Sequence, residues 1–461
     1  MLEAVNQILN GMFLPLLLLA TGIFYMFRLG FFPVVKLPVI VEVLTRGKIK
    51  NGVSSFRSLT LALAGTLGVG NIVGVASAIA MGGAGAVFWM WLSAFAAMLL
   101  KYAEVVLGLR YRYRRDETWH GGAPYYIKQG LQNRGYKRLG VFLSFIFAIL
   151  CILDSFTTGC SIQSAAISDA LDGVMGIPTY ITGLVLAVIC TALLIRGTGM
   201  IMKVTGILVP VMCGGFLFLS FICMAKRPSE ILPSLGLIFQ DAFAPKSAVG
   251  GVGGFVFSRA LRFGTMRGLL SNEAGCGTSP FAHAAADTNC PTEQGFFGIF
   301  EVFVDTILLC TVTAIVIVMN IDSVSDFGGN PMMLAIRAYS CSFEGILPIC
   351  IEVFLGVSIF CFGFATLLCW AHYGLECVAF LSKGKNGQRF YMILFAITIY
   401  FGATAAQSFL WNIADLTIGL MILLHVPFLC GFSDEVLRET ENYFAFSKQK
   451  IKKQKKFTKS S

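Results

Sequence analysis

The run Gly65-Thr66-Leu67-Gly68-Val69-Gly70-Asn71-Ile72 breaks an apolar segment that is otherwise long enough to span a bilayer. Glycine weakens a helix, and backbone groups released within hydrocarbon must find new polar partners. Such breaks therefore occur where the backbone is buried in protein or lines a polar cavity. The later run Ser271-Asn272-Glu273-Ala274-Gly275-Cys276-Gly277 has the same character. We therefore predict two discontinuous membrane helices in this chain.

The composition is that of an all-α polytopic membrane protein. Of the 461 residues, 56% are hydrophobic and 13% are charged, which is about half the charged share of a soluble domain. No cleavable signal peptide is expected, because Met1-Leu2-Glu3-Ala4 lacks a basic region. Apolar stretches predict eleven transmembrane helices. They lie at about 11–35, 59–81, 84–109, 139–168, 179–195, 204–225, 249–277, 295–319, 346–381, 390–405 and 411–431.

Positive charge is concentrated in loops that would share one side of the membrane. With the N-terminus outside, the outer loops carry only Lys226, Arg227, Lys246 and Arg337. By the positive-inside rule, we expect the lysine-rich tail to lie in the cytoplasm. We expect the host membrane to be a bacterial-type plasma (inner) membrane. This placement explains the net charge of +10 without nucleic acid, and it makes the lipid bilayer the expected partner of the basic tail.

The spans divide the chain into four parts. Residues 1–58 hold an extra N-terminal span and a basic loop, 59–225 and 249–431 hold five spans each, and 432–461 form the basic tail. Because five is odd, the second set runs opposite to the first, which predicts a 5+5 inverted repeat. Each repeat begins with a glycine-broken helix. In secondary transporters such helices hold the solute and the coupling ion near the midplane of the membrane.

The first break offers chemistry for both ligands. A half-helix that begins near Val69 and Gly70 presents unpaired N–H groups and a positive dipole end, which suit a carboxylate. The carbonyl groups released at Ala64 to Leu67 suit a hard cation such as Na⁺. The same glycines would also permit a kink for helix packing. Further predicted substrate residues of this break are Thr66, Gly68 and Asn71.

The second break contributes Asn272 and Glu273. An ionisable group at membrane depth is a functional candidate, but Glu273 is equally suited to bind the loose N–H groups of the break. Gln163 and Thr366 suit a small zwitterion or, equally, hydrogen bonds between helices. Trp370 is either a packing residue or the wall of a small cavity.

Three other charged residues invite expectations. Lys101 and Glu104 are three residues apart on one predicted helix, so we expect them to pair with each other. Asp305 is expected to serve a cation or to neutralise an arginine. The candidate arginines are Arg259, Arg262 and Arg267.

Long stretches of the chain resemble the alanine or glycine:cation symporter family, which belongs to the larger group with the leucine-transporter fold. The first block comprises residues 68–76, 82–91 and 101–104, with the sequence Gly68-Val69-Gly70-Asn71-Ile72-Val73-Gly74 at its start. The second block is Arg267-Gly268-Leu269-Leu270-Ser271-Asn272-Glu273-Ala274-Gly275, which continues to 286.

The resemblance implies sodium-coupled symport of alanine, glycine or another small neutral amino acid by alternating access, and no enzymatic activity. It implies that the substrate carboxylate binds the N–H groups of Val69 and Gly70, that Gln163 faces the substrate and that Trp370 closes the pocket. It also implies Na⁺ as the coupling ion and no other cofactor. The implied Na⁺ ligands are the carbonyls of Ala64, Leu67 and Phe362 and the hydroxyl of Thr366.

The chain departs from the family pattern near these positions. Val69 replaces a threonine, Cys160 an asparagine, Leu270 a phenylalanine and Ala365 a serine. Leu270 is therefore a smaller and more flexible wall of the predicted substrate site, and a larger or more apolar amino acid remains an alternative substrate. Ala365 removes a hydroxyl from the implied sodium shell.

Two alternative functions stay open. One is proton coupling, with Glu273, Asp154 or Asp305 as the carrier. The other is a membrane sensor that binds an amino acid without moving it. No nucleophile–base pair or metal cluster in the sequence favours an enzyme, and the oligomeric state is left open, a monomer included.

Overall fold

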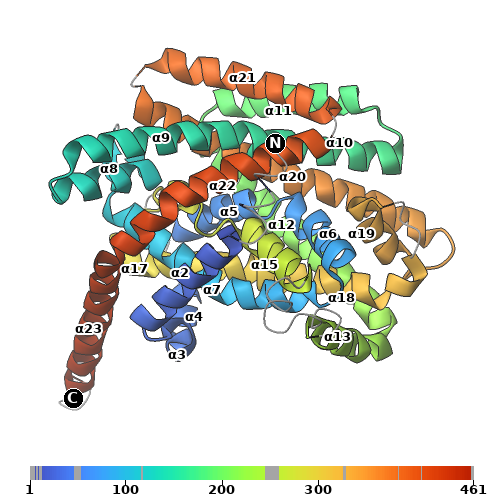
Figure 1. Ribbon diagram of the computed structural model, residues 1–461, viewed down its shortest axis with the longest axis horizontal. Helices are drawn as coiled ribbons and strands as arrows, with labels where there is room; N and C mark the ends of the chain where they lie inside the picture. Colours follow the sequence, from blue (N-terminus) through green and yellow to red (C-terminus); the bar gives the residue numbers. More distant parts are fainter. Residues whose placement is uncertain are drawn as a thin grey trace.

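The computed structural model describes residues 6, 9, 13–45, 53–115, 118–243, 259–324, 329–382, 384–405 and 407–457. These residues are almost entirely helical, and their one sheet is the hairpin of β1 (Tyr113–Arg115) and β2 (Thr118–His120). Figure 1 shows a bundle from which α23 projects at one end, while α13 and α19 lie toward the other end.

The helices of the first half are α2 (Leu14–Arg28), α3 (Phe32–Val35), α4 (Leu37–Thr45), α5 (Ser55–Thr66), η2 (Val69–Asn71), α6 (Val73–Gly82), α7 (Ala86–Arg110), α8 (Ala123–Asn133), α9 (Lys137–Phe156), η3 (Thr157–Ser161), α10 (Ile162–Met175), α11 (Thr179–Ile195), α12 (Thr198–Lys226) and α13 (Pro228–Ala242). Those of the second half are α15 (Arg259–Asn272), α16 (Ser279–His283), α17 (Pro291–Val302), η5 (Phe303–Cys310), α18 (Thr311–Met319), η6 (Ile321–Val324), α19 (Pro331–Ser340), α20 (Leu347–Leu381), α21 (Lys385–Thr404), α22 (Gln407–Gly431) and α23 (Ser433–Phe457).

Both predicted helix breaks are present. In the first, α5 ends at Thr66, and a single 3₁₀ turn, η2, precedes α6. In the second, α15 ends at Asn272 and α16 begins at Ser279. The intervening loop turns through Gly275 and Gly277, whose φ angles are +88° and +78°. Glycine adopts this left-handed region without the steric clash that a Cβ atom would cause.

Membrane spanning is supported by six helical stretches that are long and apolar enough to cross a bilayer. They are Ala86–Arg110, Lys137–Met175, Thr198–Lys226, Pro291–Met319, Leu347–Leu381 and Leu410–Gly431, and shorter apolar helices cover Leu14–Arg28, Val73–Gly82 and Thr179–Ile195. The protein is therefore a multi-pass membrane protein. The count of eleven spans, the inverted repeat and the four-part division stay predictions, and residues 249–258 of the seventh predicted span lie outside the described residues.

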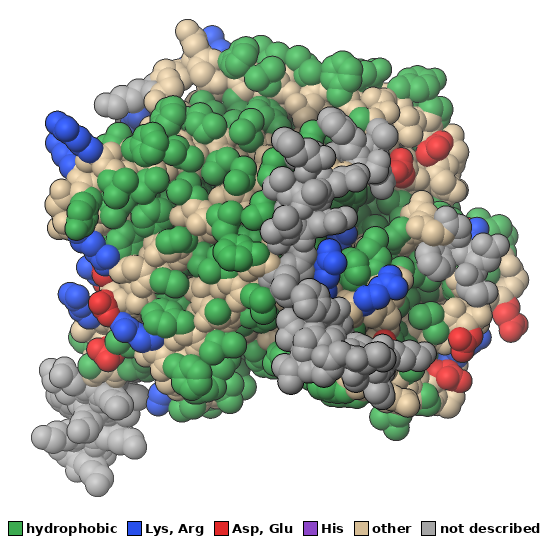
Figure 2. Space-filling model, in the orientation of Figure 1, with side chains coloured by type: hydrophobic (Ala, Val, Ile, Leu, Met, Phe, Trp, Pro, Cys, Tyr) green, Lys and Arg blue, Asp and Glu red, His purple; other side chains and the backbone are tan. Residues whose placement is uncertain are grey.

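The outer surface matches this conclusion. Figure 2 shows hydrophobic side chains over most of the visible face, with Lys and Arg gathered along the left edge, at the end from which α23 projects. Large apolar side chains such as Phe27, Val211 and Phe218 are 70%, 67% and 69% exposed. Contiguous apolar surface on this scale marks a face that is covered in the native setting, here by lipid.

The sequence analysis did not predict α8, α13, α19 or the β1–β2 hairpin. These elements are short, and they mix apolar with polar residues, so a search for long apolar stretches does not detect them. An amphipathic helix shorter than a bilayer is stabilised by packing of one face on its neighbours. Their existence therefore depends on the bundle that they cover.

A buried ion pair joins α7 to α17. Lys101 Nζ lies 3.1 Å from Glu301 Oε1, and both side chains are fully buried. The prediction that Lys101 pairs with Glu104 was wrong. Glu104 Oε1 instead accepts hydrogen bonds from the N–H groups of Gly275 and Gly277, at 2.8 and 3.1 Å. Loose backbone donors of the second break need an acceptor inside the membrane, and that need outweighs a weak local pair between residues three apart.

Replacement of one partner of this pair should destabilise the protein strongly. Lys101→Met leaves the Glu301 carboxylate buried without its lysine, which costs about 3–5 kcal/mol, so we expect a clearly lower Tm for the detergent-solubilised protein. The exposed pair of Arg28 with Asp434 is the control, because Arg28→Met should cost at most about 1 kcal/mol. Equal Tm values for the two variants would contradict the assignment.

Candidate substrate and ion site

A cavity of about 80 Å³ lies against the first break. One water molecule needs roughly 10–15 Å³ on this measure, so the cavity has room for several waters or one small solute. It is lined by Gly65, Thr66, Gly68, Val69, Gly70, Val73, Gly74, Thr158, Ile162, Gln163, Arg267, Leu270, Ser271, Glu273, Trp411, Ala414, Asp415 and Ile418. Both broken helices, the η3 and α10 segment and α22 therefore meet at one place.

The predicted substrate residues fall into two groups. Those that line the cavity are Thr66, Gly68, Val69, Gly70, Gln163 and Leu270. Those that lie behind its wall are Asn71, Asn272, Thr366 and Trp370, all of them buried. Asn272 donates hydrogen bonds to the Gly268 carbonyl at 2.8 Å and to Thr306 at 3.2 Å. Direct contact of any of these residues with substrate stays a prediction.

Gln163 forms a hydrogen bond with a backbone N–H group of the first break. Its Oε1 accepts a hydrogen bond from the Val69 N–H at 3.2 Å, and its Nε2 donates to the Thr158 carbonyl at 3.4 Å. Gly68 permits this close approach, because a Cβ atom there would lie 3.1 Å from Gln163 Oε1 and 3.0 Å from Thr366 Oγ1. A side chain at this position would therefore require Gln163 or Thr366 to shift by a few tenths of an ångström.

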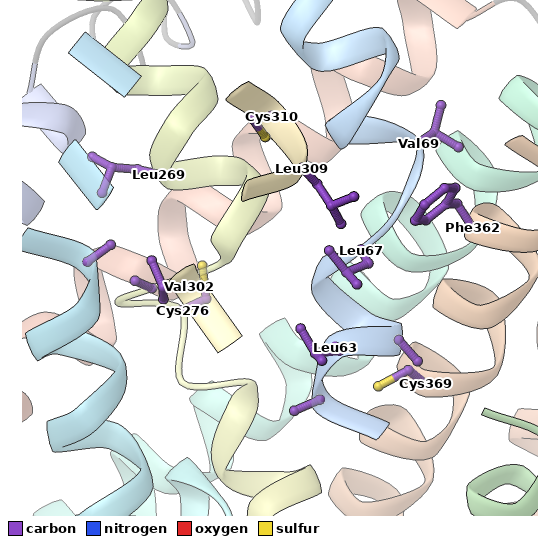
Figure 3. Packing of buried hydrophobic residues seen from close by; sticks show 14 of the residues in the cluster. Leu63, Leu67, Val69, Leu269, Cys276, Val302, Leu309, Cys310, Phe362 and Cys369 are labelled. Atoms are coloured by element: carbon purple, nitrogen blue, oxygen red, sulfur yellow. The ribbon is translucent and has the colours of Figure 1, made fainter. Parts of the chain in front are cut away.

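Three oxygen atoms converge behind the break. Thr366 Oγ1 lies 2.9 Å from the Ala64 carbonyl oxygen and 3.1 Å from the Phe362 carbonyl oxygen, and it can donate to either. Figure 3 shows α5 ending near Leu67, with Phe362 and Cys369 on the neighbouring α20. Carbonyl and hydroxyl oxygens are the ligands that hard cations prefer. This cluster contains three of the predicted Na⁺ ligands.

Glu273 connects the second break to α20 through a hydrogen bond. Its Oε1 accepts a hydrogen bond from Trp370 Nε1 at 3.0 Å, and its Oε2 accepts one from Thr278 Oγ1 at 2.8 Å. The φ angle of Glu273 is +54°, a conformation that residues with side chains rarely adopt. The alternative role considered for Glu273, binding the loose N–H groups of the break, belongs to Glu104.

Asp305, in the π-helical turn η5, connects the two breaks. Its carboxylate accepts hydrogen bonds from Asn71 Nδ2 at 2.7 Å, from Ser271 Oγ at 3.1 Å and from Thr306 Oγ1 at 2.7 Å. The expectation that Asp305 neutralises an arginine was wrong, because its hydrogen-bond partners among the described residues are these amide and hydroxyl groups. The alternative, that it serves a cation, stays a prediction.

The sequence analysis missed Trp411 and Thr158 and did not place Arg267 and Asp415 at the cavity. The Arg267 guanidinium lies 5.0 Å from the centre of the Trp411 ring, within range of a cation–π interaction. Thr158 belongs to the π-helical turn η3. π-helical turns within helices are frequent at functional sites. The available signal was the polar pair Thr157-Thr158 inside an apolar span.

Comparison with known proteins decides the family. The model of the "Sodium:alanine symporter family" matches residues 1–459. This chain belongs to the sodium:alanine symporter family. The predicted family is therefore confirmed, and this symporter is a membrane transport protein rather than an enzyme.

Similar proteins agree with the assignment. The symporter is 35% identical over 457 residues to the sodium/alanine symporter AgcS of Methanococcus maripaludis, with 98% of each chain covered. It is 32% identical to the probable sodium/glutamine symporter GlnT of Bacillus subtilis, covering 95% of this chain and 89% of that protein. A mutant manganese transporter of Eremococcus coleocola has the same fold, with a TM-score of 0.50 at 16% identity over 83% of this chain and 78% of that chain.

Gly68→Ala should impair ligand binding in this symporter, because the added methyl group displaces Gln163 or Thr366. Overpacking of this kind costs about 1–3 kcal/mol of stability. Each 1.4 kcal/mol of that cost that falls only on the ligand-bound state lowers the affinity by about tenfold. The measurement is amino acid uptake by reconstituted protein. Gly214→Ala is the control, since a Cβ atom at Gly214 meets nothing within 4 Å. Equal uptake by the two variants would refute the close packing at Gly68.

Proposed function

We propose that this symporter couples the inward movement of Na⁺ to the uptake of a small neutral amino acid, alanine or one of similar size, by alternating access. The first break carries this proposal. A cavity for a small solute, a polar backbone turn and a cluster of oxygen atoms shared with α20 meet at residues 64–70. Half-helices of this kind hold solute and ion in secondary transporters.

The substrate carboxylate binds the N–H groups of Val69 and Gly70 in this proposal. In the structure, Gln163 Oε1 accepts a hydrogen bond from the Val69 N–H, so a carboxylate that binds this N–H takes the place of the amide oxygen. The freed Gln163 side chain then turns its Nε2 toward the carboxylate, because an amide can donate as well as accept. Charged acceptors form stronger hydrogen bonds than neutral ones, which favours the exchange.

The substrate side chain faces the apolar part of the cavity. Val69, Ile162 and Leu270 form that wall and favour a short aliphatic group. Asn71, Asn272 and Trp370 act from behind the wall in this proposal by holding the two breaks in position. Any effect of these three residues on transport is then indirect.

Na⁺ binds between α5 and α20 in this proposal. Its ligands are the carbonyl oxygens of Ala64, Leu67 and Phe362 and the hydroxyl oxygen of Thr366, three of which already lie close together. Binding requires the Thr366 hydroxyl proton to turn away from the Ala64 and Phe362 carbonyls. The oxygen lone pairs that this rotation exposes then face the ion.

The membrane arrangement is part of the same proposal. Eleven helices, with repeats at 59–225 and 249–431 related by inversion, provide the two halves that move against each other. The N-terminus lies outside and the basic tail in the cytoplasm of a bacterial-type inner membrane. The gathering of Lys and Arg at the edge from which α23 projects (Figure 2) supports this orientation.

Proteoliposomes provide the direct test. An inward Na⁺ gradient should make labelled alanine accumulate above its equilibrium level, whereas protein-free liposomes and proteoliposomes without a gradient should only equilibrate. Accumulation with a proton gradient alone would replace Na⁺ by H⁺ as the coupling ion. Binding of alanine and of a wider amino acid panel without accumulation under any gradient would overturn the proposal in favour of a sensor.

Thr366→Ala tests the ion site. Loss of one ligand should raise the Na⁺ concentration for half-maximal uptake by roughly tenfold, or about 1.4 kcal/mol. Ser358→Ala is the matched control on the same helix, because the Ser358 hydroxyl donates only to the Phe354 carbonyl of its own helix, at 2.8 Å. A Na⁺ dependence that is identical in the two variants would remove Thr366 from the site.

A further inference from the structure

Asp154 is a fully buried acid in the last turn of α9, three residues before the π-helical turn η3 begins at Thr157. Its Oδ1 accepts hydrogen bonds from Thr158 Oγ1 at 2.7 Å, from Thr417 Oγ1 at 2.8 Å and from Thr157 Oγ1 at 3.3 Å. Its Oδ2 is buried and has no hydrogen-bond partner among the described residues. The two oxygen atoms of one carboxyl group therefore have very different surroundings.

No cation neutralises Asp154 within the part of the chain that the structure describes. Its hydrogen-bond partners there are hydroxyl groups. The titratable groups that interact with it electrostatically include two acids and two thiols, namely Asp415 on α22, Glu273 in the second break, Cys151 on α9 and Cys276 in the second break. Arg267, which lines the cavity, interacts with Asp415. An unpaired negative charge in such an interior costs several kcal/mol.

The hydrogen bonds at Oδ1 fit the carbonyl oxygen of a neutral acid. Such an oxygen has two lone pairs, and the short bonds from Thr158 and Thr417 occupy both. The third hydroxyl, that of Thr157, has other partners in the Leu153 carbonyl at 3.2 Å and Thr417 Oγ1 at 2.9 Å. Oδ2 is then the atom that carries a proton. A metal ion at Oδ2 would lack further protein oxygen ligands from the described part of the chain, because no polar group there lies within hydrogen-bond distance of that atom.

Thr158 connects this acid to the cavity. Its hydroxyl bonds to Asp154, and the residue also lines the cavity wall, as do Ala414 and Ile418 on either side of Thr417. A hydronium ion in the cavity gives a proton to Thr158 Oγ1 and is left as water, while the original hydroxyl proton of Thr158 passes to the carboxylate. The hydroxyl is thereby regenerated and the carboxylate becomes a neutral acid. A half-turn of the carboxyl group then brings the proton to the Oδ2 position.

We propose that Asp154 is a proton-binding site that exchanges its proton with the substrate cavity through the hydroxyl of Thr158. This inference deepens the proposed function and rests on it, since it adds a proton to the ions that the transport cycle handles. The site is separate from the oxygen cluster at Thr366, because Asp154 lies between α9 and α22 rather than between α5 and α20.

Infrared spectroscopy of the purified protein in lipid tests the proton directly and requires no substrate. The carbonyl stretch of a protonated carboxylic acid should be present at neutral pH and should lose intensity in Asp154→Asn. Asp172→Asn is the control, because Asp172 is an exposed acid on α10, and its spectrum should match the wild type. Identical carboxylic acid bands in wild type and Asp154→Asn at every pH would overturn the proposal.

Uptake measurements test the exchange of the proton between Asp154 and the cavity. At a constant Na⁺ gradient, the dependence of alanine uptake on pH should be lost in Asp154→Asn. Thr158→Val should slow proton exchange while the infrared band remains, and Thr158→Ser, which restores a hydroxyl, should restore the exchange rate. An unaltered pH profile in both Asp154→Asn and Thr158→Val would overturn the proposal. Absence of uptake by the wild type would instead count against the proposed function, and the infrared result would still decide the site.

Discussion

Backbone groups released by a helix break inside a membrane must be paired within the protein, and the rest of this structure depends on that requirement. Gln163 Oε1 pairs the Val69 N–H, Glu104 Oε1 pairs two glycine N–H groups, and Thr366 Oγ1 reaches the Ala64 carbonyl. His425 Nδ1 lies 2.7 Å from the Gly275 carbonyl oxygen. Each partner belongs to a different helix from the break whose backbone group it binds. The packing of the bundle therefore stabilises the two helices in their broken form.

The buried acids differ in whether their partner is a positively charged side chain or a neutral hydrogen-bond donor. Glu301 has a lysine, which makes it part of the fixed frame, since a buried pair is costly to separate. Among the described residues, Asp305 and Asp154 have only amide or hydroxyl donors. Neutral partners do not cancel a charge, so both acids are candidates for binding an ion or a proton. Both lie at or beside π-helical turns, where the helix geometry is already altered.

Contacts between neutral partners and contacts between opposite charges also differ in how easily they can be broken. The bonds from Val69 to Gln163 and from Trp370 to Glu273 are single hydrogen bonds. The neutral bond to Gln163 is worth about 0.5–1.5 kcal/mol net, and a bond to a charged carboxylate about 1.5–3 kcal/mol. A ligand can replace such a bond with a comparable one, so the breaks can rearrange during a transport cycle. The frame of α7 and α17 around Lys101 and Glu301 cannot rearrange in that way, because it would leave a charge unpaired in a nonpolar interior.

Sequence alone determined the features that depend on local pattern: the apolar stretches, the two glycine breaks, the asymmetry of loop charge and the family motifs. A glycine weakens a helix wherever it stands, and a span needs a set length of apolar residues. Only the tertiary structure decided which acid meets which donor. Lys101 pairs with Glu301 rather than Glu104, Asp305 binds Asn71 rather than an arginine, and Trp411 lines the cavity. The physical reason is that desolvated polar groups select their partners across helix interfaces, between residues that are distant in the chain.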